Sequence, residues 1–314
     1  MSANLQNPIF SDLNAAREAL EASRWPNGAY CPHCGATERQ AKVEGTKHRP
    51  GLYYCNQCHS TYTVTVGTVF ERSKVPLTKW WLATHLLTSS KKGMSAHQLH
   101  RMLGVTYKTA WFMAHRIREA MKDDPASTPP LGGEGKTIEA DETFLGPSET
   151  IIDKHGKPRF KPGSGRHKIV TLVERGGKAR SVKVETINAE TVGAILNYFA
   201  DRNSVLNTDE APYYKRVGKT FGGHHAVNHQ KGEYARGRTT TNTVEGFFSV
   251  FKRGMIGTYQ HCGEQHLHRY LAEFDYRYNT RTALGVDDKT RAEKLIAQIA
   301  RKRLTYRRTT VRYA

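Results

Sequence analysis

The stretch TTTNTVEGFFSVFKRG, residues 239–254, places a glutamate among phenylalanines in a strongly basic chain. One set of its residues is apolar and recurs at the spacing of a single helix face: Val244, Phe247, Phe248 and Phe251. A polar set returns to the opposite side at steps of three, four and seven residues: Asn242, Glu245, Ser249 and Lys252. The pattern therefore predicts a helix that is anchored by phenylalanines and presents a carboxylate from its other side.

Two aspartates lie near the ends of apolar, strand-like runs further upstream. Asp141 falls within KTIEADETF (136–144), and Asp209 ends the run SVLNTD (204–209) just before a turn. A buried carboxylate is costly unless it is paired or binds a metal ion. Either aspartate alone is typical of a capping or surface acid, but together with Glu245 they predict one shared site.

Three carboxylates of this kind can hold two divalent cations, one beside the attacking oxygen and one beside the leaving oxygen of a phosphodiester. Oxygen ligands favour Mg²⁺ or Mn²⁺ over zinc. Asn242 is placed to hydrogen-bond near these acids, and Lys252 is placed to hold a phosphate. The residues thus predict metal-dependent phosphodiester chemistry at Asp141, Asp209 and Glu245.

The N-terminal part of the chain contains two short cysteine pairs. CPHC (31–34) and CNQC (55–58) supply four thiolates at a spacing that is typical of one tetrahedral zinc ion. Two disulfides are the alternative, which a cytosolic chain disfavours. Because cysteine fills every coordination position, the zinc is expected to be structural and to let so small a unit fold. Its ligands would be Cys31, Cys34, Cys55 and Cys58.

Residues 76–122 are expected to form three helices, and the last two are joined by a short turn that contains Gly104. Ser95 and Thr106 are the expected N-caps of these two helices. Helix, short turn with glycine and helix is the helix-turn-helix pattern of many DNA-binding proteins, although an ordinary three-helix bundle has the same order. The second helix would present four residues to DNA: Tyr107, Lys108, His115 and Arg116.

The order of elements predicts an α/β fold for the second half of the chain. Strand-like runs at 136–146, 167–174 and 179–187 precede a helical run at 189–200 and a further strand. A Pro/Gly/Ser-rich stretch before them is typical of a linker. We therefore divide the chain into an N-terminal helix 1–27, a zinc ribbon 28–70, a helix-turn-helix 71–124, a linker 125–135, a catalytic domain 136–285 and a basic tail 286–314.

The formal net charge of +19 favours a polyanionic partner, and nucleic acid is the simplest one. The chain has no run of about 18 or more apolar residues, so neither a transmembrane helix nor a membrane partner is expected. The N-terminus lacks the basic start and apolar stretch of an export signal. We therefore expect a cytoplasmic protein associated with the nucleoid.

The chain resembles the transposases of bacterial insertion sequences, most closely the ISXO-type group (insertion-sequence family fifteen-ninety-five). The resemblance rests on CPHCG, YYCNQC, ADETFLG, NTDEAPYY, TNTVEGFFSVFKRGMIGTYQH and LHRYLAEFDYRYNTR. It implies an N-terminal zinc ribbon joined to an RNase H-like (retroviral-integrase-type) DDE domain in 136–285. It also implies that Asp141, Asp209 and Glu245 are the metal-binding triad, with Lys252 as the accompanying basic residue.

The resemblance leaves two assignments open. Some members of the group carry asparagine where others carry the third acid, and this chain has both Asn242 and Glu245. His229 precedes the third motif and is a candidate to support the site or contact DNA, the alternative being a polar loop histidine.

As a DDE transposase, the protein would bind the terminal inverted repeats of its element, cleave a phosphodiester to free a 3′-hydroxyl and join it to target DNA. The joining of two ends implies a dimer or a larger assembly on DNA. Phosphate contacts from Lys and Arg, including those of the tail, would make binding salt-dependent. Two alternatives remain: a non-catalytic DNA-binding protein derived from a transposase, and an RNase H-like nuclease that cuts without joining.

Overall fold

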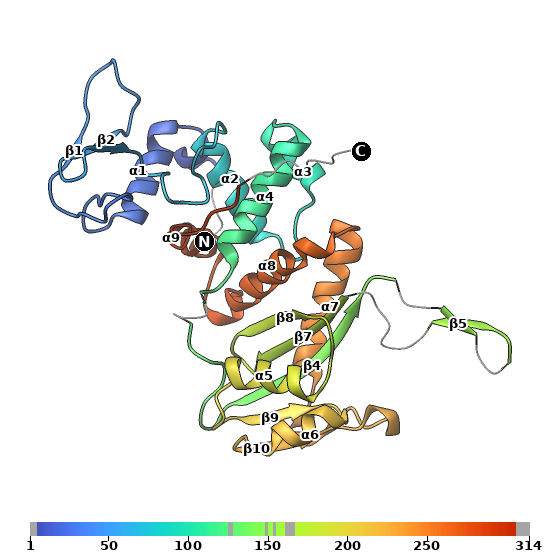
Figure 1. The fold of residues 1–314 in the computed structure, drawn as a ribbon. Helices are drawn as coiled ribbons and strands as arrows, with labels where there is room; N and C mark the ends of the chain where they lie inside the picture. The colour runs from blue at the N-terminus through green and yellow to red at the C-terminus, as the bar shows by residue number, and fades with distance from the viewer. Residues whose placement is uncertain (1–4, 125–127, 148–149, 153–154, 161–166, 306–314) are drawn as a thin grey trace, which may run out of the picture. The chain divides into compact units, whose positions relative to one another are not determined.

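The structure is a computed structural model and describes residues 5–124, 128–147, 150–152, 155–160 and 167–305 of the 314-residue chain. These residues form two compact units (Figure 1). The first comprises the residues up to Met121 and those from Val286 on, and the second is Lys122–Gly285. Parts of the expected linker (125–127) and of the expected tail (306–314) lie outside the described residues. No helix in the described part of the chain is long and apolar enough to cross a bilayer.

The first unit begins with helix α1 (Leu13–Arg24), whose N-cap Asp12 accepts hydrogen bonds from two backbone amides of the first turn. An antiparallel sheet of three short strands follows: β1 (Gln40–Lys42), β2 (Tyr53–Cys55) and β3 (Ser60–Tyr62). Trp25 packs edge-on against Tyr53 and Tyr62, whose rings stack on each other. Trp25 and Tyr62 are buried by this packing.

Three helices follow the small sheet: α2 (Leu77–Ser89), α3 (Ala96–Leu103) and α4 (Tyr107–Met121). Both predicted N-caps are confirmed, because Ser95 Oγ accepts from the amide of Gln98 at 3.1 Å and Thr106 Oγ1 from that of Thr109 at 3.2 Å. Gly104 ends α3 with a φ of 58°, a left-handed conformation that favours glycine. Two helices joined by a glycine turn are therefore present where the sequence predicts them.

The segment expected as a basic tail contains helix α9 (Asp288–Ala297), which packs within the first unit. Leu295 and Ile296 are buried, and Arg291 donates a hydrogen bond to the carbonyl of Thr88 at the end of α2. Ala292, Leu295 and Ile296 recur at the i, i+3, i+4 spacing of one helix face, a signal that the prediction of a basic tail over 286–314 did not take into account.

The second unit is built on a five-stranded sheet with the order β10-β9-β4-β7-β8. Its strands are β4 (Thr137–Leu145), β7 (His167–Glu174), β8 (Ala179–Val184), β9 (Val205–Thr208) and β10 (Gly223–Ala226). β4, β7 and β8 are antiparallel neighbours, whereas β9 runs parallel to β4 and β10 runs parallel to β9. The predicted α/β fold is confirmed for this unit, and β4 is its central strand.

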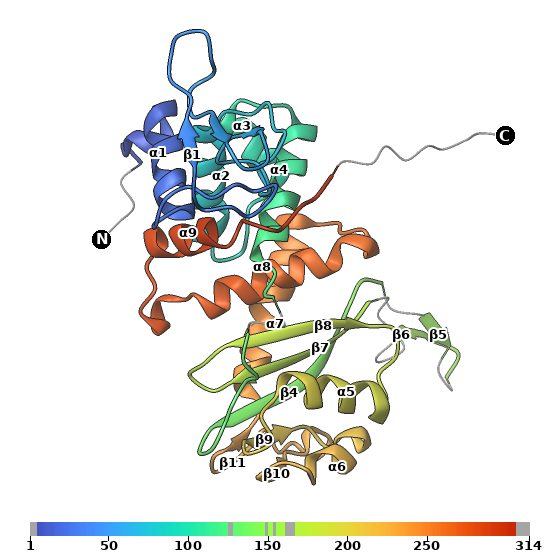
Figure 2. The same ribbon diagram turned by 60° about the vertical axis from the view of Figure 1, so that its left-hand side comes forward.

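Helices cover both faces of this sheet (Figure 2). α5 (Ala189–Phe199) and α6 (Pro212–Gly218) pack on the face that carries Ala140, whereas α7 (Asn242–Gly254) and α8 (Leu267–Asn279) pack on the opposite face. Coverage of both faces explains the almost continuous apolar run of β7. Because side chains alternate along β4, Glu139 and Asp141 belong to the face that α7 covers.

The phenylalanine face of α7 is buried as predicted and packs against α8 and β7. The remaining strands of the described residues are short: β5 (Thr150–Ile152), β6 (Pro158–Phe160), β11 (Ala235–Arg236) and β12 (Thr239–Thr240). The remaining helical segments are a π-helix (Met255–Tyr259) and 3₁₀ turns at Pro8–Phe10, His229–Lys231, Glu264–His266 and Thr282–Leu284.

Candidate functional site

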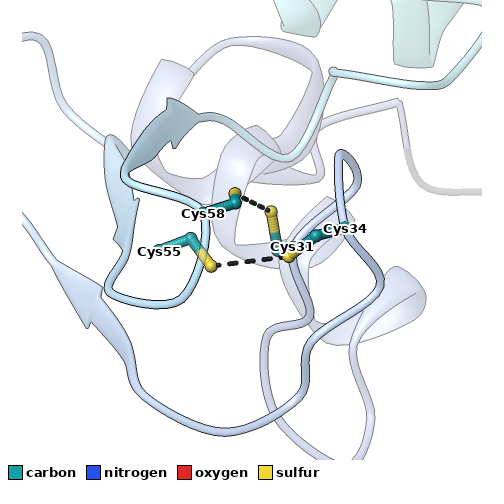
Figure 3. A group of neighbouring side chains, drawn as sticks. All are labelled: Cys31, Cys34, Cys55 and Cys58. Carbon is teal, nitrogen blue, oxygen red and sulfur yellow. Dashed lines mark hydrogen bonds between the residues drawn. The ribbon is translucent and has the colours of Figure 1, made fainter.

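The sulfurs of Cys31, Cys34, Cys55 and Cys58 gather in one cluster beside the small sheet (Figure 3). Their Sγ atoms all lie within 4.8 Å of one another, with Cys31 and Cys58 3.6 Å apart and Cys34 and Cys55 3.7 Å apart. All four are free thiols, so the disulfide alternative is not realised. Thiolates about 2.3 Å from a tetrahedral centre are about 3.8 Å apart, which is close to both distances.

Without a metal ion the cysteines of this cluster differ in protonation. Against a backbone hydrogen bond from Ala36 that lowers it, burial and the neighbouring cysteine side chains raise the pKa of Cys34 to about 12. A hydrogen bond from the backbone amide of Cys58 lowers the pKa of Cys55 to about 6. The thiolate, not the thiol, is the form that binds a metal. The donor set and the spacing of the sulfurs therefore fit one zinc ion.

Parallel pairing of β4 and β9 brings Asp141 and Asp209 together. Glu139 lies opposite Asn207 in the register of these strands, so the residues two further along each chain come level on the same face. Carboxylate oxygens of Asp141, Glu142 and Asp209 all lie within 4.8 Å of one another. The structure thus joins the two predicted aspartates in one acidic cluster.

Glu142 is a member of this cluster that sequence reasoning did not identify. Its carboxylate accepts hydrogen bonds from the hydroxyls of Tyr213 and Tyr214, both in α6. Its one signal in the sequence is its place next to Asp141. Strand alternation predicts that neighbouring side chains point to opposite faces, so adjacency alone does not suggest a shared site.

Glu245 lies in the first turn of α7, close enough to the acidic cluster for its charge to act on Asp141. Its Oε1 accepts a hydrogen bond from Thr241 Oγ1 at 2.8 Å and lies 3.6 Å from Nε2 of His229. The ring of His229 in turn packs on Tyr234, with ring centroids 5.2 Å apart. The predicted third acid and the candidate histidine are therefore neighbours.

Burial and mutual repulsion raise the pKa values of the clustered acids. Burial raises the pKa of Asp141 to about 8, and the negative charges of Glu142, Asp209 and Glu245 act in the same direction. Burial and the charge of Asp209 raise the pKa of Glu142 to about 7, and burial raises that of Asp209. A cation between these groups would relieve the repulsion. The all-oxygen donor set fits Mg²⁺ or Mn²⁺.

Two other predicted site residues also lie on α7. Asn242 is exposed at the first position of the helix, and its backbone amide donates to Thr240 Oγ1 at 3.1 Å. Lys252 is half-buried and lies seven residues after Glu245, on the same side of the helix. Of Asn242 and Glu245, only Glu245 carries a charge, and that charge raises the pKa of Asp141.

The four predicted DNA-facing residues of α4 fall into two groups. Tyr107 is 45 % exposed and Lys108 is exposed, both at the N-terminal end of the helix. His115 and Arg116 are only 1 % and 6 % exposed, and the guanidinium of Arg116 lies over the ring of Trp80. Arg116 also donates a hydrogen bond to the carbonyl of Glu71 at 2.6 Å, so contacts within the first unit hold its side chain.

Two family models match the chain. The transposase zinc-ribbon domain matches residues 12–61, and the ISXO2-like transposase domain matches residues 130–279. Among curated proteins, a protein in the transposable element ISH50 of the archaeon Halobacterium salinarum is 29 % identical over 287 residues, which cover 86 % of this chain and 92 % of the relative.

Solved structures give a weaker likeness. The mariner Mos1 paired end complex with Mg is 13 % identical and has a TM-score of 0.27, over 68 % of this chain and 76 % of that chain. The Mos1 strand transfer complex is 11 % identical with a TM-score of 0.19, over 65 % and 77 %. Both scores are too low to bear on the fold or function of this chain. On the two domain matches, which span the cysteine cluster and the acidic site alike, the chain belongs to the IS1595 family of ISXO2-like transposases.

Proposed function

We propose that the protein is a DDE transposase that binds the terminal inverted repeats of its element, cleaves phosphodiester bonds with two divalent metal ions to free 3′-hydroxyls, and joins these to target DNA. The observation that carries the proposal is the clustering of Asp141 with Glu142 and Asp209, next to the charge of Glu245. The strand order, an antiparallel meander continued by two parallel strands, supports an RNase H-like fold for this unit.

We infer that Asp141, Asp209 and Glu245 hold the cations and that Glu142 adds a fourth carboxylate at the edge of the site. Two Mg²⁺ or Mn²⁺ ions bound there would supply activation of the attacking oxygen and stabilisation of the leaving oxygen. His229 and the Thr241 hydroxyl restrain the carboxylate of Glu245 from one side.

Lys252 supplies a positive charge two turns along the same helix. We infer that it holds a DNA phosphate, since an ammonium group binds phosphate as a point charge. Asn242 is exposed at the start of the helix and is assigned no metal in this proposal. The third catalytic position is therefore given to Glu245.

For DNA recognition we propose the first unit of the chain. A zinc ion held by Cys31, Cys34, Cys55 and Cys58 keeps the ribbon folded, and the N-terminal end of α4 meets DNA through Tyr107 and Lys108. The net charge of +19 supports extensive phosphate contacts. Joining two DNA ends in one reaction requires a dimer or a larger assembly on DNA.

Substitution of the acids tests the catalytic proposal. With Mg²⁺ and DNA that carries an end of the element, Asp141→Asn, Asp209→Ala and Glu245→Gln are each expected to slow cleavage by about 100-fold or more, because each removes a cation ligand. Asn242→Ala is expected to stay within about threefold of the unaltered chain. Gel assays of cleavage, and of joining with pre-cleaved ends, measure both steps.

The outcomes of these assays distinguish the proposed function from its alternatives. Loss of cleavage in Asn242→Ala but not in Glu245→Gln would give the third position to Asn242. Cleavage without any joined product would identify a nuclease. No cleavage by the unaltered chain would leave a non-catalytic DNA-binding protein, and full cleavage in every acid variant would contradict the assignment of these acids to catalysis.

The raised pKa of Asp141 predicts a pH-dependent stability in metal-free buffer. Between about pH 5 and pH 8 the folded state keeps a proton that the unfolded state has released, so folding stability falls as the pH rises. Asp141→Asn removes this loss, and in EDTA its Tm should exceed that of the unaltered chain more at pH 8 than at pH 5. Scanning fluorimetry at both pH values measures the difference.

This comparison separates the pH effect of Asp141 from that of Asp275. Burial raises the pKa of Asp275 to about 7 as well, but Asp275 is present in both chains. Addition of Mg²⁺ at pH 8 should stabilise the unaltered chain and leave Asp141→Asn almost unmoved. An equal gain from Asp141→Asn at both pH values would contradict the account.

Removal of zinc is expected to unfold the ribbon and abolish specific DNA binding, because so small a sheet has little core of its own. Cys55→Ser should release the metal and lower DNA affinity, whereas Cys262→Ser, at a cysteine outside the cluster, should keep both. Elemental analysis of the purified chain measures zinc content, and a binding titration measures affinity. A zinc-free chain that binds its DNA normally would count against this role.

A further inference from the structure

A fully buried glutamate lies on β4, two residues before Asp141 and on the same face of the sheet. Glu139 is 0 % exposed. Its Oε2 accepts hydrogen bonds from the backbone amides of Thr243 and Val244 at 2.7 and 3.1 Å. Its Oε1 accepts from the hydroxyl of Thr243 at 2.9 Å and from Nε of Arg175 at 2.6 Å. Both oxygens therefore have partners, and two of the four bonds come from the backbone of α7.

The first amides of any helix have no partner within the helix and need a cap. The residue before α7, Thr241, makes no side-chain capping bond, because its hydroxyl is directed to Glu245 instead. Glu139 takes the place of that cap from the neighbouring strand. A negative charge at a helix N-terminus also interacts favourably with the helix dipole.

Arg175 and Asn207 hold the segment that leads into α7. The Arg175 guanidinium donates to the carbonyls of Arg238 and Thr240 at 2.6 and 3.0 Å. The side-chain nitrogen Nδ2 of Asn207 lies 3.3 and 3.4 Å from the same two carbonyl oxygens. The chain is thus fixed on the sheet directly before the helix begins.

These contacts form a layer next to the proposed metal site. Glu139 and Asn207 lie opposite each other on β4 and β9, and Asp141 and Asp209 follow two residues later on the same face. Glu245 follows directly after the second capped amide, that of Val244. The same pair of strands therefore positions the two aspartates and the start of the helix that carries the third acid.

We infer that Glu139 is a positioning residue for the third metal ligand: its carboxylate fixes the N-terminus of α7 on the strands of Asp141 and Asp209 and so sets where Glu245 meets a divalent cation. The inference rests on the proposed function in taking Glu245 as a ligand. Glutamine cannot replace the carboxylate fully, because its NH₂ group would take the place of an oxygen that accepts two of the four hydrogen bonds. Glu139 itself contacts no cation in this account.

Glu273 in α8 offers a matched control for a merely structural role. It is also 0 % exposed, pairs with Arg277 and accepts a hydrogen bond from the Tyr259 hydroxyl at 2.5 Å. It therefore secures the segment that follows the C-terminal end of α7, not its N-terminal end. Glu273→Gln makes the same chemical change at an equally buried, arginine-paired position.

The test compares Glu139→Gln and Glu273→Gln without DNA. Glu139→Gln is expected to weaken Mn²⁺ binding by about 10- to 100-fold, whereas Glu273→Gln should lower the Tm and leave Mn²⁺ affinity within about twofold. Electron paramagnetic resonance of free Mn²⁺ measures affinity. Hydrogen exchange of the Thr243 and Val244 amides, followed in metal-free buffer, should be faster in Glu139→Gln alone.

Normal Mn²⁺ affinity in Glu139→Gln would overturn the inference. If that variant does not fold, Thr243→Val removes only the hydroxyl bond to Glu139, and it should give a smaller loss of affinity in the same direction; no loss there would overturn the inference equally. Asp141→Asn separates the two proposals. An Asp141→Asn chain that still cleaves DNA overturns the proposed function, whereas an inactive one beside a normal Glu139→Gln overturns this inference only.

Discussion

Parallel pairing between β4 and β9 is the constraint on which the candidate site depends. The two strands come from segments about 70 residues apart in the chain, and their register places Glu139 opposite Asn207 and thereby Asp141 level with Asp209. A slip of one residue would turn one of these aspartates to the other face of the sheet. Apolar side chains of both strands pack under α5 and α6, which makes such a slip costly. Apolar packing on one face of the sheet therefore fixes the register that brings Asp141 and Asp209 together on the other face.

The acidic cluster is held together at a cost in stability. Burial and repulsion favour protonation of Asp141 and Glu142, so the site without a cation has less than its full negative charge at neutral pH. Binding of a cation to such a site releases a proton and lowers the free energy of the folded state. Hydrogen bonds around the site keep the carboxylates close despite their repulsion. Two tyrosine hydroxyls donate to Glu142, and α7 and Arg175 donate to Glu139.

Strong local signals made much of this structure predictable from the sequence. The phenylalanine face of α7, the caps at Ser95 and Thr106 and the cysteine knuckles each follow from a spacing or a capping preference. Strand β10 has no such signal, because GHHA (223–226) carries two histidines and no apolar alternation. Burial of His115 and Arg116 was equally hidden, since a polar side chain in a helix gives no sign that tertiary packing will cover it. Glu142 joins the acids through contacts with α6 that only the folded chain supplies.

The central claim is that Asp141, Asp209 and Glu245 together bind hard divalent cations. Crystals grown with Mn²⁺, with diffraction recorded where manganese scatters anomalously, test it most directly. The account predicts anomalous peaks at about 2.1 Å from carboxylate oxygens of all three residues. Peaks bound by Asp141 and Glu142 alone with Glu245 turned away, or no peak at these residues, would contradict it.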